Sequence, residues 1–467
     1  MNYVTSYRNC VTLSINNSLP LQSENIFTIK LKKMNYKFFY STILVLGLIS
    51  CTNDPQGASK VSGRVSDGSS ASNASSQNVR SSVSSTGVEG ATVIMAEVQA
   101  DGSLKTVSTQ SVQTDVNGNF VVETNISSAK NLVVVATKGS SEWQSVVSAE
   151  VKSGKTVYAQ PLNSESTAEA EVYARLIATG KTNVVSQADV QLYLNYDIAA
   201  QIKGNVSLKD QFISSLEARS QASSQACSNS NYGITSSQIQ TITNAKVQAQ
   251  VSFETALYNS SDSISAATAF VNYQKAIVSA YVNANVNVET YAKISKISSQ
   301  AYLNASASMS SQLSFACAKS EYMRDAFVIQ QAMEAKFQSA GATSLQSSAV
   351  VTAGASLSTS VKSSENNNQI ANAFAQYHSS IVDQLKLTLN THVTAINSID
   401  ASINGISGFK LTLNATIGVG VSTNAIVDAY VSFYNSIKVL VQASLSGASS
   451  SQISASTDIL ILANINS

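Results

Sequence analysis

Apolar residues recur every three or four positions through much of the second half of the chain. This period places them on one face of an α-helix, and a wide face of this kind packs in a helical bundle. Core packing explains these residues better than a cofactor site does. The faces are formed by Phe270, Val271, Tyr273, Ile277, Val278, Tyr281, Val288, Tyr291 and Ile294, by Ile370, Phe374, Tyr377, Ile381, Leu385 and Leu389, and by Ile426, Tyr430, Phe433, Ile437 and Leu440.

The positions of proline and glycine extend the helical prediction to all of 162–467. Pro161 is the last proline, and Ile234 to Ala340 contains neither Gly nor Pro. Strands and turns rarely cover such a length without these residues. Three helices are predicted before that stretch: Ser164 to Thr179 closed by Gly180, one capped by Ser186-Gln187-Ala188-Asp189 and one capped by Ser207-Leu208-Lys209-Asp210.

Residues 61–161 have the features of short strands. Ala91 to Ala96 is rich in strand-forming residues, Asn117-Gly118 favours a turn, and Phe120-Val121-Val122 resumes a strand. Leu132 to Ala136 and Val146 to Val151 are predicted as further strands, with Trp143 as a packing residue. We therefore expect an α+β multidomain protein, in which a small N-terminal β-sandwich precedes a large, mostly α-helical bundle.

The order of three short motifs in this β segment resembles the carboxypeptidase regulatory-like domain, a transthyretin-like β-sandwich. The resemblance covers about Lys60 to Pro161 and implies a non-catalytic accessory or spacer module. A serine-rich insert from Asp67 to Thr86 departs from the pattern, and we expect it to form a flexible loop. The motifs are Val61-Ser62-Gly63-Arg64-Val65, Gly87-Val88-Glu89-Gly90-Ala91-Thr92-Val93 and Thr114-Asp115-Val116-Asn117-Gly118-Asn119-Phe120.

Two later segments alternate between apolar and polar residues, which is the period of a strand. They are Val351 to Lys362 and Phe409 to Val421. A possible two-stranded β element is therefore predicted inside the helical bundle. We favour a ribbon whose apolar face covers the helices. The alternative is a pair of strands that the bundle stores before they insert into a membrane.

The N-terminal region carries features of an export signal. Lys37 precedes an apolar run from Phe38 to Ile49, which is too short to span a bilayer comfortably, since a span needs about 20 residues. The run ends in Leu48-Ile49-Ser50-Cys51, which resembles the lipobox of bacterial lipoproteins. The resemblance implies cleavage before Cys51, a diacylglyceryl thioether on its sulfur and an acyl chain such as palmitate on its amino group.

The resemblance to a lipoprotein implies three segments in the N-terminal region of the chain. We expect 1–33 to be an over-extended gene model with Met34 as the true start, 34–50 to be the signal peptide and 51–60 to be a tether. Thr52 follows the cysteine, where Asp would resemble an inner-membrane retention signal, so the outer membrane of a bacterial cell envelope is favoured. The membrane, reached through the lipid, is then the first expected partner.

Charge is scarce, which limits the classes of partner. Asp, Glu, Lys and Arg make up 12% of the chain, and the formal net charge is +1. Nucleic acids and anionic lipid surfaces need clustered Lys and Arg, so we expect no nucleic-acid partner. A protein partner or self-association remains compatible with this composition.

Two cysteines remain for the folded part of the exported chain. Cys10 lies in the leader and Cys51 receives the lipid, which leaves Cys227 and Cys317. In an oxidising compartment these two are expected to form a disulfide, with two separately buried thiols as the alternative. Closing so long a loop stabilises a fold by about 4 to 5 kcal/mol on the chain-entropy model.

The chain has no recognisable catalytic motif. His378 and His392 are its only histidines, and on one helix they would lie about 21 Å apart, too far to share a metal. Zinc-ligand spacings, phosphate-binding glycine loops and nucleophile elbows are also missing from the sequence. A carboxylate pair remains possible from Glu165, Glu169, Glu171 or Asp189.

We therefore expect no enzyme activity, no metal and no cofactor. The predicted function is that of a lipid-anchored cell-envelope protein with a non-catalytic binding or structural role. The alternative is a self-assembling, membrane-perturbing protein that uses the amphipathic strands 351–362 and 409–421.

Overall fold

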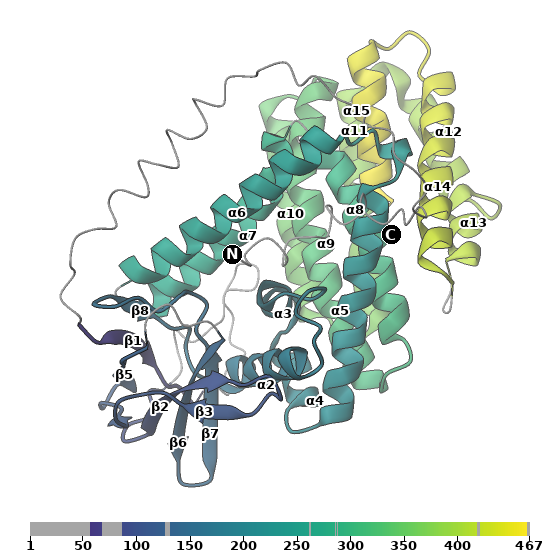
Figure 1. Ribbon diagram of the computed structural model, residues 1–467. Helices are drawn as coiled ribbons and strands as arrows, with labels where there is room; N and C mark the ends of the chain where they lie inside the picture. The colour runs from purple at the N-terminus through teal and green to yellow at the C-terminus, as the bar shows by residue number, and fades with distance from the viewer. Residues whose placement is uncertain are drawn as a thin grey trace, which may run out of the picture.

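The computed structural model describes residues 57–67, 86–126, 131–260, 263–284, 286, 288–417 and 421–464. The predicted leader, the signal peptide, Cys51 and most of the serine-rich insert lie outside the described residues. The described chain forms an N-terminal β region over 59–158, followed by an α-helical domain (Figure 1). The predicted α+β multidomain fold class is confirmed.

The β region contains two small sheets. In the first, β1 (Ser59–Arg64) pairs antiparallel with β5 (Asn119–Thr124) and parallel with β8 (Thr156–Tyr158). The second has the order β3-β2-β6-β7, and β4 also pairs with β2. Its strands are β2 (Thr92–Val98), β3 (Leu104–Thr106), β4 (Val112–Gln113), β6 (Leu132–Lys138) and β7 (Ser141–Val146).

The β6–β7 hairpin corrects one predicted strand. Lys138 pairs with Ser141, so the turn lies between them and β7 ends at Val146. The strand predicted for Val146 to Val151 is therefore wrong. The apolar residues that alternate with polar ones in this segment are buried, but they do not belong to a named strand: Val147, Ala149 and Val151.

Glycine allows the three sequence motifs of the β region to meet. Gly118 has a φ of 80°, and a Cβ there would lie 2.3 Å from the carbonyl oxygen of Val65. At Gly87 a Cβ would lie 2.0 Å from the carbonyl oxygen of Asn117. Only glycine permits these backbone approaches, so each of the two later motifs holds a glycine against another motif.

The five-stranded sheet is buried on both faces, which explains the continuous apolar run in β6. One face shares a hydrophobic cluster with the three-stranded sheet, and helix α2 (Ser164–Ala178) covers the other. The first face contributes Val93, Met95, Val134 and Ala136 against Val61, Val122 and Val157; the second contributes Ala96, Val98, Val133 and Val135 against Ala170 and Tyr173.

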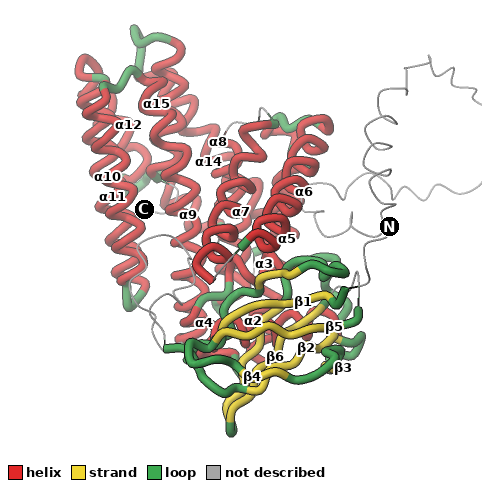
Figure 2. The backbone as a smooth tube through the Cα atoms, turned by 90° about the vertical axis from the view of Figure 1, so that its left-hand side faces the viewer, coloured by secondary structure: helices red, strands yellow, loops and turns green. Residues whose placement is uncertain are grey.

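Helices follow one another from residue 164 onward, as the absence of proline predicted. The strands gather at one end of the molecule, and the helices rise from them (Figure 2). After α2 come α3 (Gln187–Tyr193), α4 (Tyr196–Ile202), α5 (Val206–Cys227), α6 (Ser236–Asn259), α7 (Ser263–Asn283), α8 (Val288–Ser306), α9 (Ser311–Ala340), α10 (Ser344–Ser363), α11 (Asn367–Thr388), α12 (Val393–Asn404), α13 (Phe409–Thr416), α14 (Thr423–Ser444) and α15 (Ser450–Ala463).

Two of the predicted helix starts have different outcomes. The capping box of α3 forms as expected, with Ser186 and Asp189 bonding to each other's backbone N–H. The predicted cap at Ser207 is wrong, because Asn205 caps α5 and accepts a hydrogen bond from the backbone N–H of Leu208. Asp210 does not cap the helix and instead accepts a hydrogen bond from Arg175 Nε.

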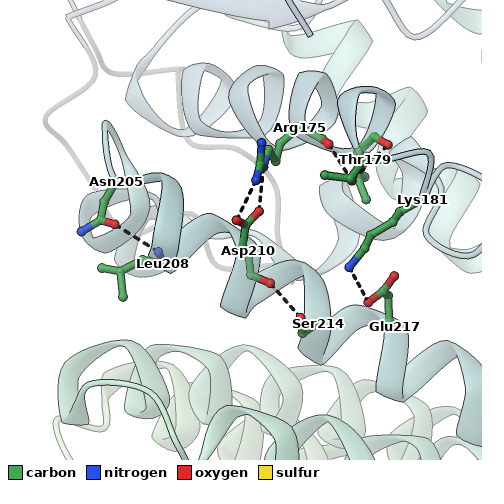
Figure 3. A network of polar contacts seen from close by, with 9 residues as sticks. Arg175, Thr179, Lys181, Asn205, Leu208, Asp210, Ser214 and Glu217 are labelled. Carbon is green, nitrogen blue, oxygen red and sulfur yellow. Dashed lines mark hydrogen bonds and ion pairs between the residues drawn. The ribbon is translucent and has the colours of Figure 1, made fainter. Parts of the chain in front are cut away.

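Ion pairs fasten α2 to α5 and so join the β region to the helices. Arg175 Nε lies 2.7 Å from Asp210 Oδ1, and Nη2 lies 2.9 Å from Oδ2, a bidentate geometry (Figure 3). Lys181 and Glu217 form a second pair of 2.9 Å farther along α5. The pairs are partly exposed and each contributes little to stability, but they link α2 and the turn that follows it to α5.

The helices form two hydrophobic clusters. The cluster next to the β region contains apolar residues from both sheets and from α2 to α9, so the two parts of the chain share one core. The second cluster lies among the later helices and buries two of the predicted apolar faces, the one from Ile370 to Leu389 and the one from Ile426 to Leu440. Every residue of the face from Ile370 to Leu389 is buried. In the face from Ile426 to Leu440, only Leu440 is partly exposed.

The possible two-stranded β element is not present in the described residues, because none of them lies in a strand and most are helical. Residues 351–362 belong to α10, and 409–416 form α13. A capping box between Thr343 and Gln346 starts α10. Within α13, Leu413 is buried whereas Leu411 is 57% exposed, although a strand would place both on one face.

Candidate functional site

The predicted lipidation residue, Cys51, lies outside the described residues. Within those residues, no helix has both the length and the apolar character that a membrane span requires.

The predicted disulfide between Cys227 and Cys317 is not formed. Cys317 is a buried free thiol on α9, and burial raises its pKa to about 12. Cys227, at the end of α5, belongs to the cluster of the later helices, whereas Cys317 belongs to the cluster shared with the β region. The two side chains are thus part of different cores, and a thiol with so high a pKa is unreactive at neutral pH.

The two histidines lie in different elements. His378 is on α11, where its Nε2 lies 3.0 Å from Asp400 Oδ1 of α12. His392 ends the short helix η3 (Asn390–His392). Among the described residues no group of three His, Cys, Asp or Glu side chains could hold a metal ion.

The four candidate carboxylates lie in separate places: Glu165, Glu169 and Glu171 on α2 and Asp189 on α3. Glu171 forms an ion pair of 2.6 Å with Lys209, and Asp189 belongs to the capping box of α3. These interactions are those of helix caps and surface ion pairs, and they give neither side chain the environment of a catalytic acid or base.

A buried group of charged residues lies where α5, α8 and α9 meet. Arg219 Nε of α5 is 3.3 Å from Glu321 Oε1 of α9, and Lys296 Nζ of α8 is 3.7 Å from Asp325 Oδ2. Glu321 is completely buried. Charges this deep require partners, and these two pairs supply them across the helix interfaces.

Tyr193, at the end of α3, receives two guanidinium groups. The Arg219 guanidinium carbon is 4.5 Å from the centre of its ring, and that of Arg324 is 5.1 Å from it. A tyrosine face attracts a cation, and the attraction is larger where water is excluded. The ring therefore helps two like charges to lie in one buried region.

Arg324 is only partly buried and differs from Arg219 and Lys296 because, among the described residues, it interacts with a carboxylate, that of Glu321, only beyond ion-pair distance. In the described part of the chain no acidic side chain forms an ion pair with it, and its Nε is buried without a hydrogen-bond partner. A guanidinium group has five N–H donors and no means of losing its charge at neutral pH. An uncompensated donor of this strength is costly to bury.

Arg324 lines a cavity of about 80 Å³ between the helices. Two further donors in its wall are nearly inaccessible: Tyr193 is 2% exposed and Ser295 is 4% exposed. The hydroxyl of each lacks a hydrogen-bond partner in the described residues. Burial raises the pKa of Tyr193 well above its usual value, so its hydroxyl keeps the proton that it can donate.

The α6–α7 hairpin closes the other side of the cavity. Lys246 of α6 lines the cavity and donates to the Tyr281 hydroxyl at 3.1 Å, and the Tyr281 ring stacks on Tyr291 with centres 4.1 Å apart. The hairpin reaches from the helices to the β region (Figure 1), where the Tyr258 hydroxyl donates to the Glu150 carbonyl oxygen. The β region therefore supports one wall of the cavity.

This site was not predicted from the sequence, although one feature pointed to it. Glu321, Arg324 and Asp325 are spaced three and four residues apart, which places them on one helical face in a chain with little charge. Such a group is more often solvated than buried. Its burial depends on residues far away in sequence, such as Arg219, which is 102 positions from Glu321.

Comparison of the chain with models of known families, with curated proteins and with solved structures found no match.

Proposed function

We propose that this chain is a lipid-anchored protein of the bacterial cell envelope, with the outer membrane as its favoured site, and that it acts by non-catalytic binding. The binding site is the cavity between α3, α5, α8, α9 and the α6–α7 hairpin. The observation that carries the binding role is the set of buried donors in this cavity that lack partners: Arg324, Tyr193 and Ser295.

The anchor is supported by the sequence around Cys51. The apolar run and Leu48-Ile49-Ser50-Cys51 meet what the lipoprotein pathway requires. A diacylglyceryl group together with an amide-linked acyl chain holds a protein on a membrane stably, because each buried methylene contributes about 0.8 kcal/mol. β1 begins at Ser59, so the folded protein would start close to the membrane surface.

The geometry favours binding over chemistry. The cavity wall presents a guanidinium, hydroxyls and tyrosine rings, and its one carboxylate, Asp189, caps a helix. A general base or nucleophile with an activating partner is missing from the residues that line this cavity. Fixed donors around a small space are typical of a site that holds a ligand.

The resemblance of 60–161 to the carboxypeptidase regulatory-like domain agrees with an accessory role for the β region. Its contacts with α6 and its core shared with α2 to α9 support a specific task, that of a platform for the cavity. We therefore propose that the β region is more than a spacer.

Labelling of Cys51 tests the anchor. Cells that make the full chain are grown with labelled palmitate, and the wild type is compared with Cys51→Ser and with Cys317→Ala as the matched control, because Cys317 is a free cysteine of the folded part. We expect label and detergent-phase partitioning for the wild type and Cys317→Ala, and neither for Cys51→Ser. Label or detergent partitioning that persists in Cys51→Ser would refute the anchor.

The membrane-perturbing alternative is not proposed. Of the segments that it needs, 351–362 and 409–416 are helical, and no described residue of 351–362 or 409–421 belongs to a strand.

A further inference from the structure

We propose that the cavity beside Arg324 binds a small oxyanion, with a carboxylate or phosphate group held by the Arg324 guanidinium. This inference rests on the proposed binding role of the helical domain and names the chemistry of its ligand.

Charge is the first argument for an anion. Of the cations in the cavity wall, Arg219 is paired with Glu321, whereas Arg324 has no ion-pair partner among the described residues. Lys246 adds a further positive charge and contacts only a neutral phenol within hydrogen-bond distance. The carboxylate in the wall, Asp189, accepts from the backbone N–H of Ser186 at 2.9 Å and also attracts Lys246, so three cations face two carboxylates, Glu321 and Asp189. An anion in the cavity would compensate the excess positive charge.

The kind of donors is the second argument. A guanidinium fork matches the two oxygens of a carboxylate or phosphate, and such charge-assisted bonds are about twice as strong as neutral ones. The unpartnered hydroxyls of Tyr193 and Ser295 can donate to the same ligand. A neutral or cationic ligand would leave the guanidinium without a counterion. An oxyanion satisfies all three groups together.

Size limits the ligand. The cavity measures about 80 Å³, and an engineered protein cavity of about 150 Å³ binds benzene, so the space suits an ion of a few heavy atoms. Acetate and inorganic phosphate meet this limit, whereas a nucleotide does not. The buried position of Tyr193 and Ser295 also favours a free ion over a headgroup that remains in a bilayer.

Equilibrium binding tests the proposal. The full-length protein is purified in detergent and titrated calorimetrically with sodium acetate and with inorganic phosphate, at ionic strength held constant with sodium chloride. We expect saturable binding of at least one of them at one site per chain. No saturable binding of either ion would overturn the proposal.

Variants locate the binding. Arg324→Met should weaken it about tenfold or more, since a hydrogen bond to a charged group contributes about 1.5 to 3 kcal/mol. Tyr193→Phe keeps the ring, removes the hydroxyl and should weaken binding less. Lys386→Met is the matched control, because Lys386 pairs with Asp383 on the surface of α11. Equal affinities for the wild type and for folded Arg324→Met and Tyr193→Phe would overturn the assignment.

Vesicles distinguish the source of the anion. Soluble Cys51→Ser protein is sedimented with phosphatidylglycerol vesicles, and we expect no Arg324-dependent binding. Cosedimentation lost in Arg324→Met, without binding of the free ions, would contradict a free ligand. If palmitate labels Cys51 but neither ion binds, only the ligand assignment fails. If the ions bind but Cys51 is unlabelled, only the anchor fails.

Discussion

The guanidinium carbon of Arg324 lies 5.1 Å from the centre of the Tyr193 ring. The contact joins α9 to the end of α3 and holds the charge at the wall of the cavity. An attraction of this kind is worth about 0.5 to 2 kcal/mol, which is less than an ion pair would give a buried guanidinium. Arg324 is thus held in position by the ring while its Nε keeps no hydrogen-bond partner among the described residues, so this donor is available to a ligand.

The first prediction concerns the cost of this arrangement. Arg324→Met should change the free energy of unfolding of the ligand-free protein by no more than about 1 kcal/mol, because Arg324 is partly exposed and forms no close ion pair in the described part of the chain. Arg219→Met is the comparison and should lower it by about 3 kcal/mol, because it leaves the completely buried Glu321 unpaired. Urea unfolding measures both. A larger loss for Arg324→Met than for Arg219→Met would contradict the difference we draw between the two arginines.

The second prediction is a pH dependence. Burial raises the pKa of the Glu321 carboxyl above its ordinary value of 4.5, although Arg219 opposes the change. The folded protein therefore holds this proton more tightly than the unfolded chain does. The stability that protonation contributes is complete below 4.5 and is lost as pH rises through the folded-state pKa.

Glu321→Gln removes this titration. The free energy of unfolding of the wild type, minus that of the variant, should increase as pH falls from neutral toward 4.5. Urea unfolding at a series of pH values measures the difference. A flat or falling difference would show that the Glu321 pKa is not raised.

The third prediction tests the meeting point of the β motifs. Gly118→Ala should lower the free energy of unfolding by about 3 kcal/mol, since it adds a Cβ at 2.3 Å from a backbone oxygen and at a φ of 80°. Gly139→Ala is the matched control: its φ is 59° and a Cβ there meets nothing within 4 Å. It should cost about 1 kcal/mol. Equal losses would mean that the backbones do not approach as described.

The fourth prediction separates helix from strand in α13. Leu413→Asp should lower the free energy of unfolding by about 3 kcal/mol, because Leu413 is 7% exposed. Leu411→Asp and Thr412→Asp should change it little, since both positions are exposed on the helix. In a strand, positions 411 and 413 would share one face. Comparable losses at these two positions would therefore favour the strand.

The sequence predicted helices well where one face carries large apolar residues and the opposite face carries small or polar ones. Ile370, Phe374 and Tyr377 could only be buried on one helical face, and the structure buries them. In α10 most positions are Ala, Ser, Thr or Val, so the two-residue and helical periods are almost equally strong. Packing decided the outcome: Gly354 lies so close to α9 that a Cβ there would be 2.9 Å from Gln330 Cγ.

The candidate site was less accessible to sequence reasoning. The helical spacing of Glu321, Arg324 and Asp325 was visible, but their burial was not, because it depends on helices that meet only in the folded chain. The unpartnered Nε of Arg324 could be found only in the folded structure. The same holds for the buried free thiol of Cys317, since no distance between the cysteines follows from the sequence.

The most direct measurement is an anomalous diffraction map of crystals soaked in selenate, an oxyanion with the shape of phosphate. We expect a selenium peak in the cavity, with oxygens within hydrogen-bond distance of the Arg324 guanidinium, and no such peak in Arg324→Met crystals. Selenate found only on the surface, with the Arg324 cavity lacking a peak in the wild type, would contradict the claim that this cavity is a ligand-binding site.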